Sequence, residues 1–189
     1  PSCPSPNPET TALVLSHYLA TKYPGCKALL ISTPWSLHSE KTKVMVEQLK
    51  KSLGDKNVKT AAIIIHDDGK RKNVRLGDLI NAKDFDALAD QHPDCNIIIT
   101  MVGLPDDKQK MKLWNNPNRH IAMLSISLIN NSKAIFDGKV VAAVALKPGS
   151  SQVKIPPDLK PEERFALRYI LVTPQNIAEL QKKYPLLIR

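Results

Sequence analysis

The sequence predicts an α/β fold in three layers, with helices on both faces of a doubly wound, mostly parallel sheet of about six strands. Two observations predict this class. Short, almost wholly apolar runs alternate along the chain with longer amphipathic segments of helical spacing. The apolar runs carry hydrophobic residues at successive positions, which is typical of strands that a sheet buries on both faces.

The first elements follow from these periodicities. Apolar residues at helical spacing predict a helix over residues 9–23, which a Pro-Gly pair ends. The run KALLIST predicts the first strand at residues 27–33, and valines and leucines spaced among lysines and glutamates predict a helix over residues 39–53. Three consecutive isoleucines in residues 58–66 predict a second strand that is buried on both faces.

The same alternation continues through the middle of the chain. A turn-rich insert at residues 67–79 precedes a helix that Asn81 caps and that runs to Gln91. The next expected elements are a strand at residues 95–102, a short helix at 106–114, a strand at 120–125, a helix at 128–136 and a strand at 140–146. We expect these five strands in the Rossmann-like order 2-1-3-4-5, together with one extra strand.

Both ends of the chain depart from this pattern. Residues 1–8 hold four prolines and predict a leader or linker. Residues 149–163 are rich in proline and serine and predict a connector, which leads to the extra strand at residues 164–173 and a closing helix at residues 175–184. We therefore expect a single α/β domain over residues 9–189.

The composition limits the kinds of protein that this chain can be. With 42% hydrophobic and 24% charged residues it is ordinary for a folded domain, and no apolar run reaches the roughly 20 residues of a membrane-spanning helix. The formal charge of +9 is compatible with nucleic acid or an acidic partner. Because the basic residues are scattered and only 5% of residues are aromatic, a solvated basic surface is favoured over a nucleic-acid site, which stays open.

Candidate ligand contacts follow from the expected sheet. Ligands of open α/β sheets gather outside the carboxyl ends of the strands, where the strand order reverses. The residues after the predicted strands that suit such an edge are Thr33, Trp35, Ser36, His66, Asp68, Thr100, Gly103, Asp106, Ser125 and Lys147. Each has a structural alternative, since serine often only caps a helix and Asp106 suits a helix N-terminus.

The chain shows no motif of known chemistry. A glycine-rich phosphate loop, an H-E-x-x-H pair and a G-x-S-x-G elbow are all missing from the sequence. We therefore expect a non-catalytic binding or interaction module without cofactor or metal, whose partner is a small polar ligand or a protein. The alternatives are an enzyme that uses the same edge on a small polar or anionic substrate, and a basic module that binds a polyanion.

Two cysteines occupy equivalent positions. Cys26 and Cys95 begin the first and third predicted strands, which are neighbours in the expected order. Adjacent strands lie about 5 Å apart, within the reach of a disulfide, so a bond between the two is one hypothesis. Two buried free thiols are the alternative. A bridge would require an oxidising compartment.

One stretch resembles a known family. The segment AIFDGK at residues 134–139 leads into the strand at residues 140–146, and with DCNIII at residues 94–99 and the helix at residues 9–23 it resembles the C-terminal lobe of type I periplasmic sugar-binding proteins. The resemblance covers residues 9–148. It implies a ligand-binding lobe and favours a location outside the cytoplasm, in the periplasm or anchored to a membrane by a removed N-terminus.

The chain departs from that family at the ligand contacts. Where the family tends to carry Asn, Asp and Gln after its strands, this sequence reads TMVG at residues 100–103, SIS at residues 125–127 and Leu146-Lys147. Most of the polar clamp for a sugar is therefore missing. The resemblance implies the fold and the edge of the site, and leaves the natural ligand open.

Overall fold

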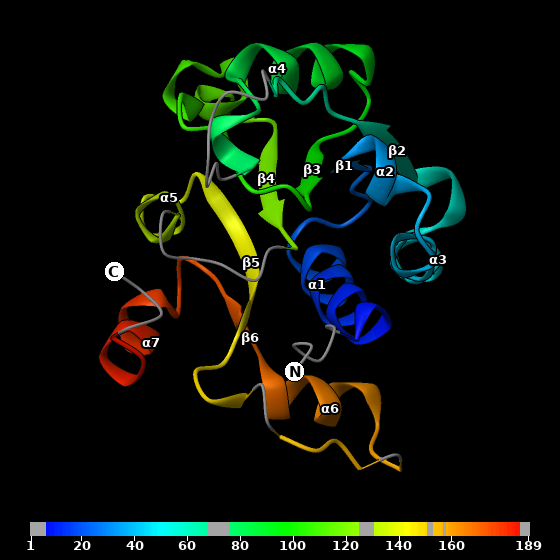
Figure 1. Ribbon diagram of the computed structural model, residues 1–189, viewed down its shortest axis with the longest axis vertical. Helices are drawn as coiled ribbons and strands as arrows, with labels where there is room; N and C mark the ends of the chain where they lie inside the picture. The colour runs from blue at the N-terminus through cyan, green and yellow to red at the C-terminus, as the bar shows by residue number, and fades with distance from the viewer. Residues whose placement is uncertain (1–6, 68–75, 125–130, 151–152, 157, 186–189) are drawn as a thin grey trace.

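The computed structural model describes residues 7–67, 76–124, 131–150, 153–156 and 158–185. Within these residues it confirms the predicted fold class, with a six-stranded sheet in the order β2-β1-β3-β4-β5-β6 (Figure 1). The first five strands are parallel, and β6 is antiparallel to β5. The strands are β1 Ala28–Ser32, β2 Val58–Ala62, β3 Ile97–Thr100, β4 His120–Met123, β5 Val140–Leu146 and β6 Tyr169–Val172.

Helices cover both faces of the sheet. Helices α1 (Pro8–Lys22), α3 (Glu40–Leu53) and α6 (Pro161–Arg168) pack on one face. Helices α4 (Ala82–Gln91), α5 (Ser132–Phe136) and α7 (Ile177–Lys183) pack on the other. Short elements fill the connections: α2 at Pro34–Leu37 and 3-10 turns at Asp55–Asn57, Leu76–Asp78, Lys108–Lys110 and Lys112–Asn115.

The core has two layers because successive residues of each strand point to opposite faces. Leu30 of β1 pairs with Ile99 of β3, and both lie in the layer under α1 and α3. Leu29 pairs with Ile98, and both lie in the layer under α4. All residues of β1 and β3 are buried, which is the physical reason for their continuous apolar sequences.

Side-chain caps set the starts of the main helices. The Oδ1 atom of Asn7 accepts a hydrogen bond from Thr10 N at 3.2 Å, and Asn81 caps α4 in the same way, as predicted. Helix α1 begins at Pro8, one residue before the predicted start, because proline fits the first turn of a helix.

The first helix is tied to the end of the chain. Asn7 N donates to the Tyr169 hydroxyl at 3.0 Å, a contact across 162 residues. The Tyr18 hydroxyl of α1 donates to Val141 O of β5 at 3.3 Å. Helix α1 therefore joins the amino-terminal region to β5 and β6.

The prediction for residues 164–173 was partly wrong. Residues up to Arg168 belong to α6, and only Tyr169–Val172 form a strand. The helix begins with Pro161 and two glutamates, which suit a first turn, and Glu163 accepts a hydrogen bond from Lys160 N at 2.8 Å. The apolar residues of the helix and of the strand run together in the sequence, which hid the boundary between them.

The second strand also differs from its prediction. Strand β2 ends at Ala62 and lies at the edge of the sheet, so it is only partly buried. Of the three isoleucines, Ile63 is buried, whereas Ile64 is 60% exposed. The isoleucine run was therefore wrongly interpreted as a strand buried on both faces.

Two predicted helices are shorter than expected. Residues 106–114 contain 3-10 turns in place of one helix. The helix predicted over residues 128–136 spans Ser132–Phe136, and residues 125–130 lie outside the described part of the chain.

Ile98 tests the central position of β3. This side chain is fully buried, so Ile98→Asp should cost about 4 kcal/mol or more and abolish the cooperative unfolding transition in urea. The matched variant Ile64→Asp changes an exposed isoleucine and should keep its urea midpoint close to the original. A native transition in Ile98→Asp would contradict the assignment of β3 to the centre of the core.

Candidate functional site

The carboxyl ends of β1 and β3 meet where the strand order reverses. From β1 the chain continues outward to β2, and β3 lies on the other side of β1, with α3 and α4 on opposite faces. Such a switch point is where open α/β sheets hold ligands. The fully buried Ser32 ends β1 here, and its Oγ atom has no hydrogen-bond partner among the described residues.

The segment after β1 contains three of the predicted contacts. Thr33 is buried and caps α2, accepting a hydrogen bond on its Oγ1 from Ser36 N at 3.2 Å. The Ser36 hydroxyl lies 3.5 Å from Thr42 Oγ1 in the first turn of α3. Trp35, between them, is 66% exposed. The structure therefore has Thr33 in a structural role and leaves the Trp35 side chain open to solvent.

The predicted contact residues at the end of β3 and in the loop after it form hydrogen bonds within the protein. The buried Thr100 Oγ1 donates to Gly103 O at 2.7 Å and accepts from Val102 N at 3.2 Å, so it braces the loop. Gly103 adopts a φ of 81°, in the left-handed region that favours glycine. Asp106 N donates to Gly77 O at 3.3 Å, which ties this loop to the segment before α4.

His66 lies with the start of α4. Its Nε2 atom is 2.7 Å from Asp84 Oδ2 and 3.0 Å from Asn81 Nδ2, and the ring is exposed. Both partners belong to the first turn of the helix or its cap. The histidine and the carboxylate form a surface pair.

Lys147 is separated from the other predicted contacts. It follows β5, which β3 and β4 separate from β1. Its Nζ donates to Ala166 O of α6, and its backbone N donates to Arg168 O at 2.8 Å. The last two predicted contacts, Asp68 and Ser125, lie outside the described residues.

The two cysteines lie in different core layers. Cys26 packs with α1 and α3, and Cys95 packs with α4. Both are buried free thiols in the structure, and burial raises the pKa of each. The structure therefore has the two buried free thiols that were the alternative to a disulfide.

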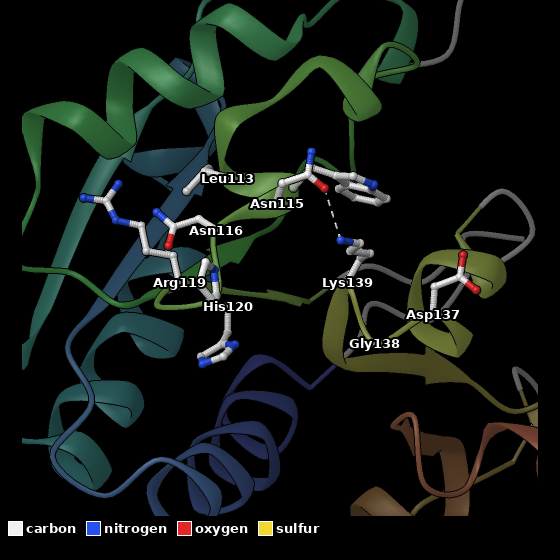
Figure 2. Close-up of a pocket in the computed structure, with 10 residues that line it drawn as sticks. Leu113, Asn115, Asn116, Arg119, His120, Asp137, Gly138 and Lys139 are labelled. Carbon is white, nitrogen blue, oxygen red and sulfur yellow. Dashed lines mark hydrogen bonds between the residues drawn. The ribbon is translucent and has the colours of Figure 1, made fainter.

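A cavity of about 280 Å³ lies at the opposite, amino edge of the sheet (Figure 2). Its lining comes from the turn before β4 and the turn between α5 and β5. The lining residues are Leu113, Trp114, Asn115, Asn116, Pro117, Arg119, His120, Asp137, Gly138 and Lys139. This cavity was not predicted from the sequence, because ligands of open α/β sheets are expected at the carboxyl ends of the strands. The polar cluster NNPNRH directly before a strand was the available signal.

His120 is one of the residues that line this cavity. The ring is half-buried and lies against Tyr23, with the ring centroids 4.4 Å apart. Burial lowers the pKa of His120 and raises the pKa of Tyr23. Both shifts favour the uncharged form of the side chain.

The described residues contain no group of three or more His, Cys, Asp or Glu side chains placed to hold a metal ion. Among the same residues, no helix has the length and apolar character needed to cross a membrane.

Thr100→Val tests the brace after β3. The variant keeps the shape of the side chain and leaves Val102 N and Gly103 O without this partner, so it should destabilise the fold by about 1–3 kcal/mol in urea unfolding. Thr21→Val changes an exposed threonine, whose hydroxyl donates to His17 O at 2.9 Å, and should cost less than about 0.5 kcal/mol. Equal costs for the two variants would argue against a bracing role.

His120 should make stability depend on pH. Its folded-state pKa is lowered, whereas the unfolded chain should have a pKa near 6.5, so the unfolded state binds more protons between these values. Its stabilising contribution is complete above about pH 6.5 and is lost as the pH falls through the folded pKa.

Urea unfolding at about pH 5 and about pH 8 measures this effect. His120→Gln should reduce the difference between the two conditions, and the matched variant His38→Gln at an exposed position should not. An unchanged pH dependence in His120→Gln would contradict the assignment.

Solved structures share this fold. AraP, an arabinose binding protein from Geobacillus stearothermophilus, aligns with a TM-score of 0.56 and 16% identity over 92% of this chain and 63% of its own. A sugar-binding protein of a sugar ABC transporter from Bacillus halodurans aligns with a TM-score of 0.57 and 14% identity, over 92% of this chain and 64% of its own. A carbohydrate transporter from Acidothermus cellulolyticus, in complex with myo-inositol, aligns with a TM-score of 0.55 and 12% identity, over 97% of this chain and 63% of its own.

No protein-family model matches the sequence, and no curated protein matches it. The chain spans less than two thirds of the length of the first two of these sugar-binding structures. At this level of identity the matches concern the fold. They confirm the predicted resemblance to type I periplasmic sugar-binding proteins as a structural likeness that extends over most of this chain.

Proposed function

We propose that this chain is a non-catalytic binding module that holds a small polar, sugar-like ligand at the carboxyl edge of β1, β2 and β3. The observation that carries the proposal is Trp35, which is 66% exposed directly after β1, beside the switch point. Leaving so large an apolar side chain in water is unfavourable, and its flat face suits packing against the C–H face of a sugar ring.

Hydroxyl groups near Trp35 supply the polar part of the site. Ser32 Oγ is buried without a partner among the described residues, so it lies beneath this edge and not on its surface. Ser36, Ser39 and Thr42 form a second set, with Ser39 Oγ donating to Thr42 Oγ1 at 3.2 Å. An aromatic face beside hydroxyls is a surface for binding, and the proposal assigns it no reaction.

The names of the matched structures support a polyhydroxylated ligand. One is an arabinose binding protein, and another is a complex with myo-inositol. This chain shares their fold, and its sequence lacks most of the polar residues that the resembled family tends to carry after its strands. We therefore propose a ligand of this chemical class, bound more weakly than in a closed site. A location outside the cytoplasm is part of the same proposal.

A protein partner is the second candidate, and Ile64 favours it. This side chain is 60% exposed after β2, the strand next to β1, so two large apolar residues face solvent along one edge. Exposed apolar patches of this kind mark sites of protein interaction as well as of ligand binding. The Trp35 and Ile64 variants separate the two candidates.

Titration with arabinose and myo-inositol tests the proposal. In a Trp114→Phe background, which leaves Trp35 as the fluorophore, a binding sugar should change the emission with a Kd of about 1 mM, as expected for a ligand covered on one side. Trp35→Ala, followed by calorimetry, should weaken binding about tenfold through the lost contact.

The controls are matched to this edge. Phe136→Ala removes an aromatic side chain that is 59% exposed, ahead of β5, and should leave binding unchanged. Ile64→Ser should matter little for a sugar and greatly for a protein partner. Absence of binding by a panel of pentoses, hexoses and inositols, or equal losses in Trp35→Ala and Phe136→Ala, would refute the sugar-like ligand.

A further inference from the structure

The cavity at the amino edge of β4 and β5 carries an inference that is independent of the proposed function. We infer that it is a second binding site, which takes a small organic anion bearing a phosphate or carboxylate group. The site lies at the opposite end of the strands from Trp35 and is built from different segments of the chain.

The charge of the lining is the first argument. Arg119 and Lys139 are both half-buried, and neither has an ion-pair partner within the described ranges. Lys139 Nζ donates only to the neutral Asn115 Oδ1, at 3.3 Å (Figure 2). The carboxylate of the lining, Asp137, is already held by Lys133 Nζ at 2.9 Å. The cavity therefore presents positive charge that its own residues do not neutralise.

Two other cations at the amino ends of the strands lie near a carboxylate. Lys59 Nζ lies 2.8 Å from Asp94 Oδ1, and Lys27 Nζ lies 3.8 Å from Asp94 Oδ2. These lysines also stand at the amino ends of strands, ahead of β1 and in β2. Asp94 thus lies beside Lys27 and Lys59, whereas the described residues give Arg119 and Lys139 no carboxylate partner, and a ligand would supply one.

The hydrogen-bonding groups of the lining favour an acceptor ligand. Asn115 Oδ1 accepts from Lys139, and Asn116 Oδ1 accepts from Asn118 N at 2.9 Å. Neither Nδ2 group donates a hydrogen bond to another described residue, so both remain as donors for a ligand. Phosphate and carboxylate oxygens accept hydrogen bonds and carry negative charge, so they match guanidinium, ammonium and amide donors together.

The size of the cavity sets the kind of anion. A volume of about 280 Å³ far exceeds that of an inorganic ion and is close to the lower end of small-molecule sites, about 300 Å³. Leu113, Trp114 and Pro117 add apolar surface to the lining. The ligand therefore has an organic body the size of a monosaccharide in addition to its charged group.

His120 fits the same chemistry. Its ring is half-buried and lies against the Tyr23 ring, and burial lowers its pKa, which favours the uncharged form. A bound anion would favour the imidazolium form and raise the pKa of His120.

Three ligands with a common body test the inference. Glucose, glucose 6-phosphate and glucuronate differ only in the anionic group, and inorganic phosphate supplies the group without the body. In amide NMR titrations at low ionic strength, we expect glucose 6-phosphate, glucuronate or both to shift the resonances of residues 113–120 and 137–139, with glucose giving no shift there. Inorganic phosphate should bind more weakly than glucose 6-phosphate.

Charge-neutral variants locate the site. Arg119→Gln and Lys139→Gln should each weaken anion binding at least about tenfold, as expected for a lost charge-assisted hydrogen bond. Lys41→Gln removes an exposed lysine of α3 and should change the Kd less than about twofold. Thermal melting shows that each variant is folded.

The outcomes decide the inference. Absence of shifts at residues 113–120 and 137–139 with both anions at about 10 mM would overturn it, as would equal binding of glucose there or equal losses in Lys41→Gln and Lys139→Gln. Trp35→Ala should leave anion binding intact. Sugar binding at the carboxyl ends of the strands and anion binding at their amino ends can therefore be refuted independently of each other.

Discussion

The pairing of β1 with β3 is the constraint on which the rest of the structure depends. Both strands are buried along their whole length, and four registered pairs join them in parallel. Parallel strands cannot be joined by a tight turn, so each connection must cross a face of the sheet, and the helices that cross it become the outer layers. The switch point, both sheet edges and the two core layers follow from this one contact.

The fold could be predicted from the sequence where the apolar runs are continuous. Residues such as Ile97–Thr100 and Val140–Leu146 are buried on both faces, and their sequences reflect it directly. The boundary at Arg168 could not be predicted, because the apolar residues of α6 and β6 form one run. The exposure of Ile64 depends on β2 lying at an edge, which its own sequence does not encode.

The candidate contacts at the carboxyl edge could be predicted in position but not in role. Thr33, Thr100 and Lys147 do follow strands, yet their polar atoms bind the protein itself. Whether a hydroxyl is occupied depends on which loop atoms come within about 3 Å, and that is decided by tertiary packing. The amino-edge cavity needs two turns that are remote in sequence, so neither turn alone predicts it.

The contact between Asn7 and Tyr169 bears on the order in which the parts of the chain fold. Asn7 caps α1, but its hydrogen-bond partner belongs to β6, 162 residues later. Contacts between such distant residues slow folding, because a long loop must close before they form. The apolar side of α1 packs mainly against α3 and the central strands, so these contacts can form early, and only its contacts with α6, β5 and β6 depend on later residues. The hydrogen bond between Asn7 and Tyr169 should therefore be among the last to form, and it fastens a helix that the core already holds.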